Sequence, residues 1–180
     1  MAVKRNLSAH GMLPVHIAPC GMNCRLCVAY TREKNPCPGC RGLDRGKPKT
    51  RFLCRIRLCT ERGEGKYCFR CGSFPCDWLD HLDRRYRRKY SMSMCDNLER
   101  IRASGVRKFL REEKVRWSCP GCGRILSVHR AKCLSCGRRW RSDAPHVLPE
   151  SDAVRSRRRK VTLSRSAQAA KRKGRGSPFR

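Results

Sequence analysis

Apolar residues recur at helical spacing through residues 77–116, which predicts that this stretch is helical. Its first part places five large apolar side chains on one helix face, and Asp77 stands where it can cap the start. The basic sequence RRYRRK lies within the same predicted helix. The five apolar residues are Trp78, Leu79, Leu82, Tyr86 and Tyr90.

The remainder of this stretch predicts two further helices. Leu98 and Ile101 form one short apolar face, and the sequence Ala-Ser-Gly at 103–105 interrupts it. The second face is formed by Val106, Phe109 and Leu110. We expect a plain helical hairpin that packs on the cysteine-rich part of the chain, with a DNA-reading helix–turn–helix as the alternative.

Residues 20–76 show the opposite pattern, because they hold ten cysteines and very few long aliphatic side chains. Such a segment buries too little apolar surface to fold by itself, so bound metal must supply much of its folding free energy. We expect metal-binding knuckles, short strands and loops there.

Residues 142–180 are poor in apolar residues and rich in Arg, Lys and Ser, which predicts a disordered basic tail. The whole pattern predicts a small metal-stabilised α+β protein with an irregular multi-zinc knuckle region, short helices, a C-terminal zinc ribbon and this tail. We divide the chain into a flexible N-terminal segment (1–18), a cysteine-rich metal-binding region (19–79), a helical segment (80–117), the zinc ribbon (118–141) and the tail (142–180).

The charge balance adds a candidate partner to this outline. The chain has 44 Lys and Arg residues against 14 Asp and Glu residues, a formal net charge of +30. A four-thiolate zinc site carries only about −2, so several such sites leave the chain strongly basic. A surface of this charge attracts polyanions such as nucleic acid, acidic proteins or anionic lipid headgroups.

The 15 cysteines indicate metal sites rather than disulfides. Their number is odd, most of them come in Cys-x-x-Cys pairs, and residues 1–19 contain no apolar run of the length that a secretory signal needs. No segment is long and apolar enough to span a bilayer. We therefore expect a cytoplasmic protein without membrane contact.

The clearest motif is WSCPGCGRILSVHRAKCLSCGRRW, which contains two Cys-x-x-Cys knuckles. Glycine follows each knuckle, where it permits the tight turn that points backbone N–H groups at the sulfurs. Four thiolates suit tetrahedral zinc and leave no position for water or substrate, which predicts a structural zinc ribbon. His129 lies between the knuckles, and we expect a surface residue there rather than a replacement ligand. The expected ligands are Cys119, Cys122, Cys133 and Cys136.

The N-terminal cysteines predict further metal sites, but their spacing does not fix which of them share an ion. One arrangement forms two four-thiolate sites, the first from Cys24, Cys27, Cys37 and Cys40 and the second from Cys54, Cys59, Cys68 and Cys71. Interleaved arrangements fit the spacing equally well. We expect two to three zinc ions in the whole chain, with an iron–sulfur cluster as the alternative for the N-terminal site. The first arrangement leaves over Cys20 and Cys76, which complete the ten candidate ligands.

Two short matches to enzyme motifs do not hold. The spacing Cys20-x3-Cys24-x2-Cys27 is that of radical enzymes that bind S-adenosylmethionine and a [4Fe–4S] cluster, but the chain after Cys27 lacks the alternating strand–helix pattern of their domain. The Pro-Cys-x-x-Cys at 36–40 ends the zinc deaminase signature, yet no His-x-Glu precedes it.

The sequence also lacks a catalytic constellation. It contains no phosphate-binding Gly-rich loop with its lysine, and no Ser or Cys nucleophile beside an evident His base. We expect Cys95, the one cysteine outside the clusters, to be a small buried apolar group, with a reactive thiol as the alternative. A non-enzymatic protein is the more natural expectation.

The stretches CGMNCRLCVAY, PCPGCRG, KYCFRCGSFPCDWL, NLERIRASGVRKFL and RWSCPGCGRILSVHRAKCLSCG together resemble a known prokaryotic family. The family is the cysteine-rich domain of unknown function 3795, and the resemblance extends over residues 19–137. It implies a metal-binding fold, in some members with a similar ribbon, and it adds no activity. The high positive charge and the Arg/Lys-rich tail depart from the more usual family pattern.

From these features we expect a zinc-binding, non-enzymatic protein that binds DNA or RNA through its basic surface and tail. The alternatives are an iron–sulfur or redox protein that uses the N-terminal cysteines, and a zinc-stabilised adaptor for a protein partner. The basic residues expected to contact nucleic acid are Arg84, Arg85, Arg87, Arg88, Lys89, Arg138, Arg139, Arg141, Arg157, Arg158, Arg159, Lys160, Lys171, Arg172 and Lys173.

Overall fold

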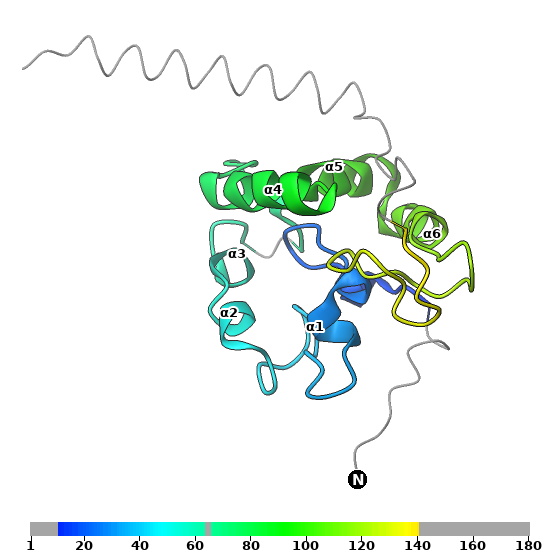
Figure 1. Cartoon of the computed structure of the whole chain (residues 1–180). Coiled ribbons are helices and arrows are strands. Elements are labelled where there is room, and N and C mark those ends of the chain that lie inside the picture. Colours follow the sequence, from blue (N-terminus) through cyan, green and yellow to red (C-terminus); the bar gives the residue numbers. More distant parts are fainter. Residues whose placement is uncertain (1–10, 64–65, 141–180) are drawn as a thin grey trace, which may run out of the picture. The chain divides into compact units, whose positions relative to one another are not determined.

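The computed structural model describes residues 11–63 and 66–140, which form short helices joined by loops (Figure 1). The N-terminal part contains single turns of helix: η1 (Pro14–His16), η2 (Cys24–Leu26), α1 (Val28–Thr31), α2 (Lys49–Phe52), α3 (Arg55–Leu58) and η3 (Cys68–Arg70). Three longer helices follow: α4 (Asp77–Tyr90), α5 (Met94–Ser104) and α6 (Val106–Arg116). The predicted tail lies outside the described residues, as does most of the predicted flexible N-terminal segment.

No β-sheet forms within the described residues, so the β part of the expected α+β class is wrong there. Isolated bridges stand in place of the expected short strands, and they join Ile17 to Asn23, Ser118 to Ile125 and Lys132 to Arg139. Each bridge closes a tight turn, and the last two enclose the two ribbon knuckles. A chain that bends around a pair of sulfurs turns away before a second pair of ladder hydrogen bonds can form.

The three longer helices confirm the helical interpretation of residues 77–116. In α4, Leu79 and Tyr86 are buried as expected, whereas Trp78 is 55% exposed and does not belong to the buried face. Asp77 is the first helical residue, and Cys76 occupies the capping position. The periodic pattern therefore located the helix and its buried side, but it assigned Trp78 to the wrong side.

A single residue, Gly105, separates α5 from α6. Its φ of +79° is a conformation that glycine adopts without strain. The turn of a DNA-reading helix–turn–helix has about 3–4 residues, so this one-residue connection favours the plain hairpin. Ile101 of α5 packs with Phe109 and Leu110 of α6, and Ile17 completes this small apolar cluster.

The larger apolar core is shared between the helices and the cysteine-rich segments. It joins Leu26, Leu79, Leu98 and Leu126, which come from segments far apart in the sequence. Figure 1 shows α4 and α5 beside each other, with the N-terminal segments and the last loops packed beneath them. The cysteines are therefore positioned by a core to which the helices contribute much of the apolar surface.

A buried carboxylate ties α4 to the start of α5. Asp83 is completely buried and accepts hydrogen bonds from the Ser93 hydroxyl (2.7 Å) and from the backbone N–H of Cys95 (3.0 Å). Arg87 pairs with Asp83 at 2.8 Å and with Asp96 at 2.7 Å. Burial opposes the ionisation of Asp83, but these hydrogen bonds and the Arg87 charge outweigh it and lower the pKa of Asp83. Because of this network, Arg87 is not one of the solvent-facing charges that the sequence RRYRRK suggests.

Candidate metal centres

The four ribbon cysteines converge as the spacing predicts. Their sulfurs all lie within 4.8 Å of one another. The Sγ atoms of Cys119 and Cys136 are 3.6 Å apart, and those of Cys122 and Cys133 are 3.7 Å apart. Sulfurs that surround one zinc ion tetrahedrally at a Zn–S distance of about 2.3 Å stand about 3.8 Å apart. The arrangement thus fits a single tetrahedral ion.

Backbone N–H groups inside the knuckles are directed at the sulfurs. The N–H of Gly121 donates to the Cys119 Sγ, and the N–H of Ser135 donates to the Cys133 Sγ, both at 3.4 Å. The Gly121 hydrogen bond is the main cause that lowers the pKa of Cys119 to about 7. This sulfur is therefore readily available as a thiolate, the form that binds metal.

The ribbon is anchored to the N-terminal segment and to α4. The backbone N–H of Val128 and the hydroxyl of Ser127 both donate to the Leu26 carbonyl, at 2.9 and 3.1 Å. His129 accepts from the backbone N–H of Val28 at 3.3 Å, and its Nε2 lies 3.0 Å from the Tyr86 hydroxyl. His129 therefore connects parts of the fold and lies neither among the converging ribbon sulfurs nor free on the surface.

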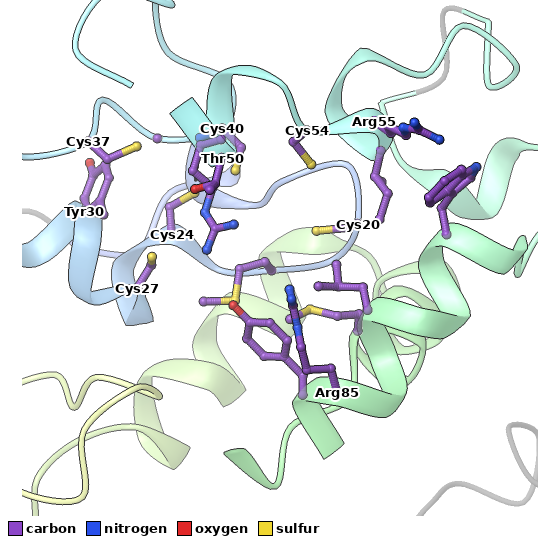
Figure 2. A pocket seen from close by; sticks show the side chains of 18 of the residues that line it. Cys20, Cys24, Cys27, Tyr30, Cys37, Cys40, Thr50, Cys54, Arg55 and Arg85 are labelled. Atoms are coloured by element: carbon purple, nitrogen blue, oxygen red, sulfur yellow. Dashed lines mark hydrogen bonds between the residues drawn. The ribbon is translucent and has the colours of Figure 1, made fainter. Parts of the chain in front are cut away.

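Six of the N-terminal cysteines surround one cavity with a volume of about 310 Å³ (Figure 2). We call it the six-cysteine cavity. Its wall also contains the arginines Arg51, Arg55 and Arg85 and the buried side chains of Met22, Tyr86 and Met94. The six cysteines are Cys20, Cys24, Cys27, Cys37, Cys40 and Cys54.

Cys40 is the common neighbour within this cavity. Its backbone N–H donates to the Cys24 Sγ at 3.4 Å. A hydrogen bond between the two thiols raises the pKa of Cys24 and lowers that of Cys40 to about 7. Burial raises the pKa of Cys20, and the nearby sulfurs of Cys40 and Cys54 raise it further. The thiols thus face a common space.

The remaining four N-terminal cysteines line a second cavity of about 300 Å³, which we call the four-cysteine cavity. Burial raises the pKa of Cys68 to about 12, and the other three sulfurs are close enough to oppose its ionisation. Knuckle geometry is present here too, because the N–H of Cys71 donates to the Cys68 carbonyl at 3.0 Å. The four are Cys59, Cys68, Cys71 and Cys76.

These two cavities divide the N-terminal cysteines differently from the first arrangement that the spacing suggested. Cys54 lines the six-cysteine cavity, and so does Cys20, which was left over in that arrangement. Cys76, also left over there, lines the four-cysteine cavity. Among the described residues, only the ribbon brings at least three possible ligand atoms within 4.8 Å of one another. Cys95 is buried in α5, outside both cavities, which agrees with a small apolar role.

The basic residues singled out in the sequence have different surroundings. Arg84, Arg85, Arg88 and Lys89 are exposed on α4, whereas Arg87 belongs to the Asp83 network. Two more, Arg138 and Arg139, are exposed in the ribbon. The others lie outside the described residues: Arg141, Arg157, Arg158, Arg159, Lys160, Lys171, Arg172 and Lys173. No helix in the described part of the chain is long and apolar enough to cross a membrane.

Comparison with known proteins finds a family match in the N-terminal segment. No curated protein and no solved structure matches the chain. The expected resemblance to domain of unknown function 3795 is confirmed for the segment that holds the ten N-terminal cysteines, and the ribbon lies beyond the matched residues. Residues 16–81 match the model of the family described as "Protein of unknown function (DUF3795)".

Proposed function

We propose that this protein is a non-enzymatic, zinc-stabilised protein that binds DNA or RNA through its basic surface. In this proposal the ribbon cysteines hold one zinc ion and the four-cysteine cavity holds a second. Four thiolates complete the coordination of one ion in each site, so both sites are structural. Their function is to fix the loops that carry the basic side chains.

The observation that supports nucleic-acid binding is the solvent face of α4. Arg88 and Lys89 are exposed and form no ion pair within the described residues. Arg84, one turn earlier, is paired with Asp80 at 3.2 Å but keeps 70% of its side chain exposed. Surface ion pairs of this kind are worth about 0–1 kcal/mol, so a phosphate group competes with Asp80 at little cost.

A binding assay across a salt series tests the proposal. Full-length protein is titrated into labelled single-stranded and double-stranded DNA and RNA. Affinity should fall steeply as the salt concentration rises. Each phosphate contact contributes about −0.9 to the slope of the logarithm of the binding constant against the logarithm of the salt concentration. The triple variant R84Q/R88Q/K89Q should bind about tenfold more weakly, and the slope of its salt dependence should be shallower by about 2–3.

A matched triple variant on α6 provides the control. Arg107, Lys108 and Arg111 are also exposed, so R107Q/K108Q/R111Q removes the same charge from another surface. Removal of residues 151–180 should weaken binding without changing the zinc content. If both triple variants lose the same affinity for nucleic acid, the effect comes from overall charge and not from an interface on α4. No salt-dependent binding to any of the nucleic acids would overturn the function itself.

A further inference from the structure

Trp78 differs from the other two tryptophans of the chain in its exposure. Trp117 and Trp140 are buried in the core, whereas Trp78, in the first turn of α4, keeps 55% of its side chain exposed. Single exposed apolar residues are common on protein surfaces, so exposure alone indicates no ligand. The side chains around Trp78 supply the further observations.

A cation lies directly on the exposed indole ring. The guanidinium carbon of Arg55, from α3, is 4.2 Å from the centroid of the Trp78 ring. A guanidinium at this distance attracts the ring through a cation–π interaction, and it thereby restricts the orientation of the indole. Both residues also line the two cysteine cavities, so the cysteine segments and α4 position the pair together. The result is a flat aromatic surface that is fixed and partly open to solvent.

Further cations follow Trp78 along the same side of α4. At 100° per residue, the positions seven and eleven residues after Trp78 return to within about 20° of its direction. These positions are Arg85 and Lys89, and both side chains are exposed. Figure 2 shows Arg55 and Arg85 reaching from α3 and α4 beside the same cavity. An aromatic ring followed by a row of cations is complementary to a strand in which bases alternate with phosphates.

From the exposed ring, the guanidinium on it and these cations, we propose that Trp78 and Arg55 form a stacking surface for an unpaired base of single-stranded DNA or RNA. The base stacks on the part of the indole that now contacts water, and Arg85 and Lys89 contact neighbouring phosphates. Bases inside a duplex are already stacked on each other and offer no free face. This inference rests on the proposed nucleic-acid binding and adds the form of nucleic acid that is preferred.

Tryptophan fluorescence of the full chain tests the stacking directly. A base that stacks on an indole quenches its emission, and the burial of Trp117 and Trp140 keeps them out of reach. The chain is titrated with oligo(dT), oligo(U), a DNA duplex and an abasic strand that carries the same phosphates. We expect quenching by the single strands that have bases, and none by the duplex or the abasic strand. Quenching by only one of oligo(dT) and oligo(U) supports the proposal and identifies the preferred strand as DNA or RNA.

Two negative results have different meanings. Single strands that bind without quenching overturn the stacking surface and leave Trp78 to packing or to a protein partner. Absence of binding to every one of these ligands overturns the proposed function itself.

Substitutions at Trp78 separate the ring from its fluorescence. W78F keeps an aromatic ring and should keep most of the affinity for oligo(dT), whereas W78L should bind it about tenfold more weakly. Unlike R84Q/R88Q/K89Q, W78L should bind the duplex as the native chain does. F52L is the matched control, because Phe52 on α2 is also an exposed aromatic residue, at 44%.

Circular dichroism of the helices shows whether each variant is folded, and the quenching of the native chain requires no variant at all. Folded W78L that binds oligo(dT) as tightly as the native chain contradicts the assignment. Equal losses of affinity for oligo(dT) in W78L and F52L contradict it too, because they indicate a general effect of exposed apolar surface.

Discussion

The ribbon and the three longer helices are stabilised by different means. In the ribbon, four sulfurs 3.6–3.7 Å apart across two pairs are the central contacts, and two of the four cysteines are exposed. In the helices, Leu79, Leu98 and Phe109 are fully buried, and a buried carboxylate crosslinks α4 to α5. The comparison shows that one small fold combines a part centred on four sulfurs that could hold a metal ion with a part that depends on burial and hydrogen bonds.

Removal of zinc should have the largest effect and should act on the ribbon first. Binding of structural zinc to four ligands contributes about 10–16 kcal/mol in zinc-finger peptides, so the ribbon should open when a strong chelator is added. Trp140 is buried against Trp117 at 5.3 Å between ring centroids, and opening should expose it and shift its fluorescence to longer wavelength.

The control for zinc removal is the helix signal in circular dichroism, recorded in the same titration. Most of that signal comes from α4, α5 and α6, and we expect it to survive at chelator concentrations that shift the fluorescence. Simultaneous loss of both signals would show that the two parts form one cooperative unit and would remove the distinction drawn above.

Loss of the buried carboxylate should have the next largest effect, and it should act on the helices. Asp83→Ala leaves the Cys95 N–H and Arg87 without their buried partner, which costs about 3 kcal/mol. Chemical denaturation measures this difference in the free energy of unfolding. Asp80→Ala is the matched control on the same helix, because its partner Arg84 is mostly exposed and such a surface pair is worth about 0–1 kcal/mol.

The same residue should give a recognisable pH dependence. The folded state lowers the pKa of Asp83 from its ordinary value of 3.8, so its contribution is present above that value and is lost as the pH falls through the lower folded pKa. The stability difference between the native chain and Asp83→Asn should therefore shrink in acid. A difference that stays constant down to pH values well below 3.8 would contradict the ionised state of Asp83.

The smallest of these effects on stability concerns the contact between the first cysteine loop and α5. Gly21 has a φ of +86°, and a Cβ there would lie 2.7 Å from the Met94 carbonyl oxygen and 2.9 Å from the Leu98 Cγ. Gly21→Ala should cost about 2 kcal/mol in unfolding experiments. Gly63→Ala, at a positive φ with no atom within 4 Å, should cost less, and equal costs would show that contact with α5 is unimportant.

Sequence reasoning located the parts of the fold that depend on local spacing. The helical period found α4, α5 and α6, and the knuckle spacing found the ribbon cysteines. Both signals come from residues that are close together in the sequence, so they can be recognised without knowing which distant segments they contact.

The grouping of the N-terminal cysteines could not be found in the same way. Cys54 and Cys76 fit several arrangements by spacing, and contacts between distant segments decide between them. Distant segments do meet in this region, since the Cys68 N–H donates to the Pro19 carbonyl at 2.9 Å. The role of Asp83 was missed for a similar reason, since a carboxylate within a charged run gives no sign that it is buried.

The hydrogen bonds that anchor the ribbon have a consequence for the order of folding. Ser127 and Leu26, like His129 and Val28, are joined across 101 residues of sequence. Ribosomes add about 5–20 residues per second, so Leu26 and Val28 are synthesised roughly 5–20 s before their ribbon partners. During that interval the first cysteine segment exists without the contacts that join it to the ribbon in the complete fold.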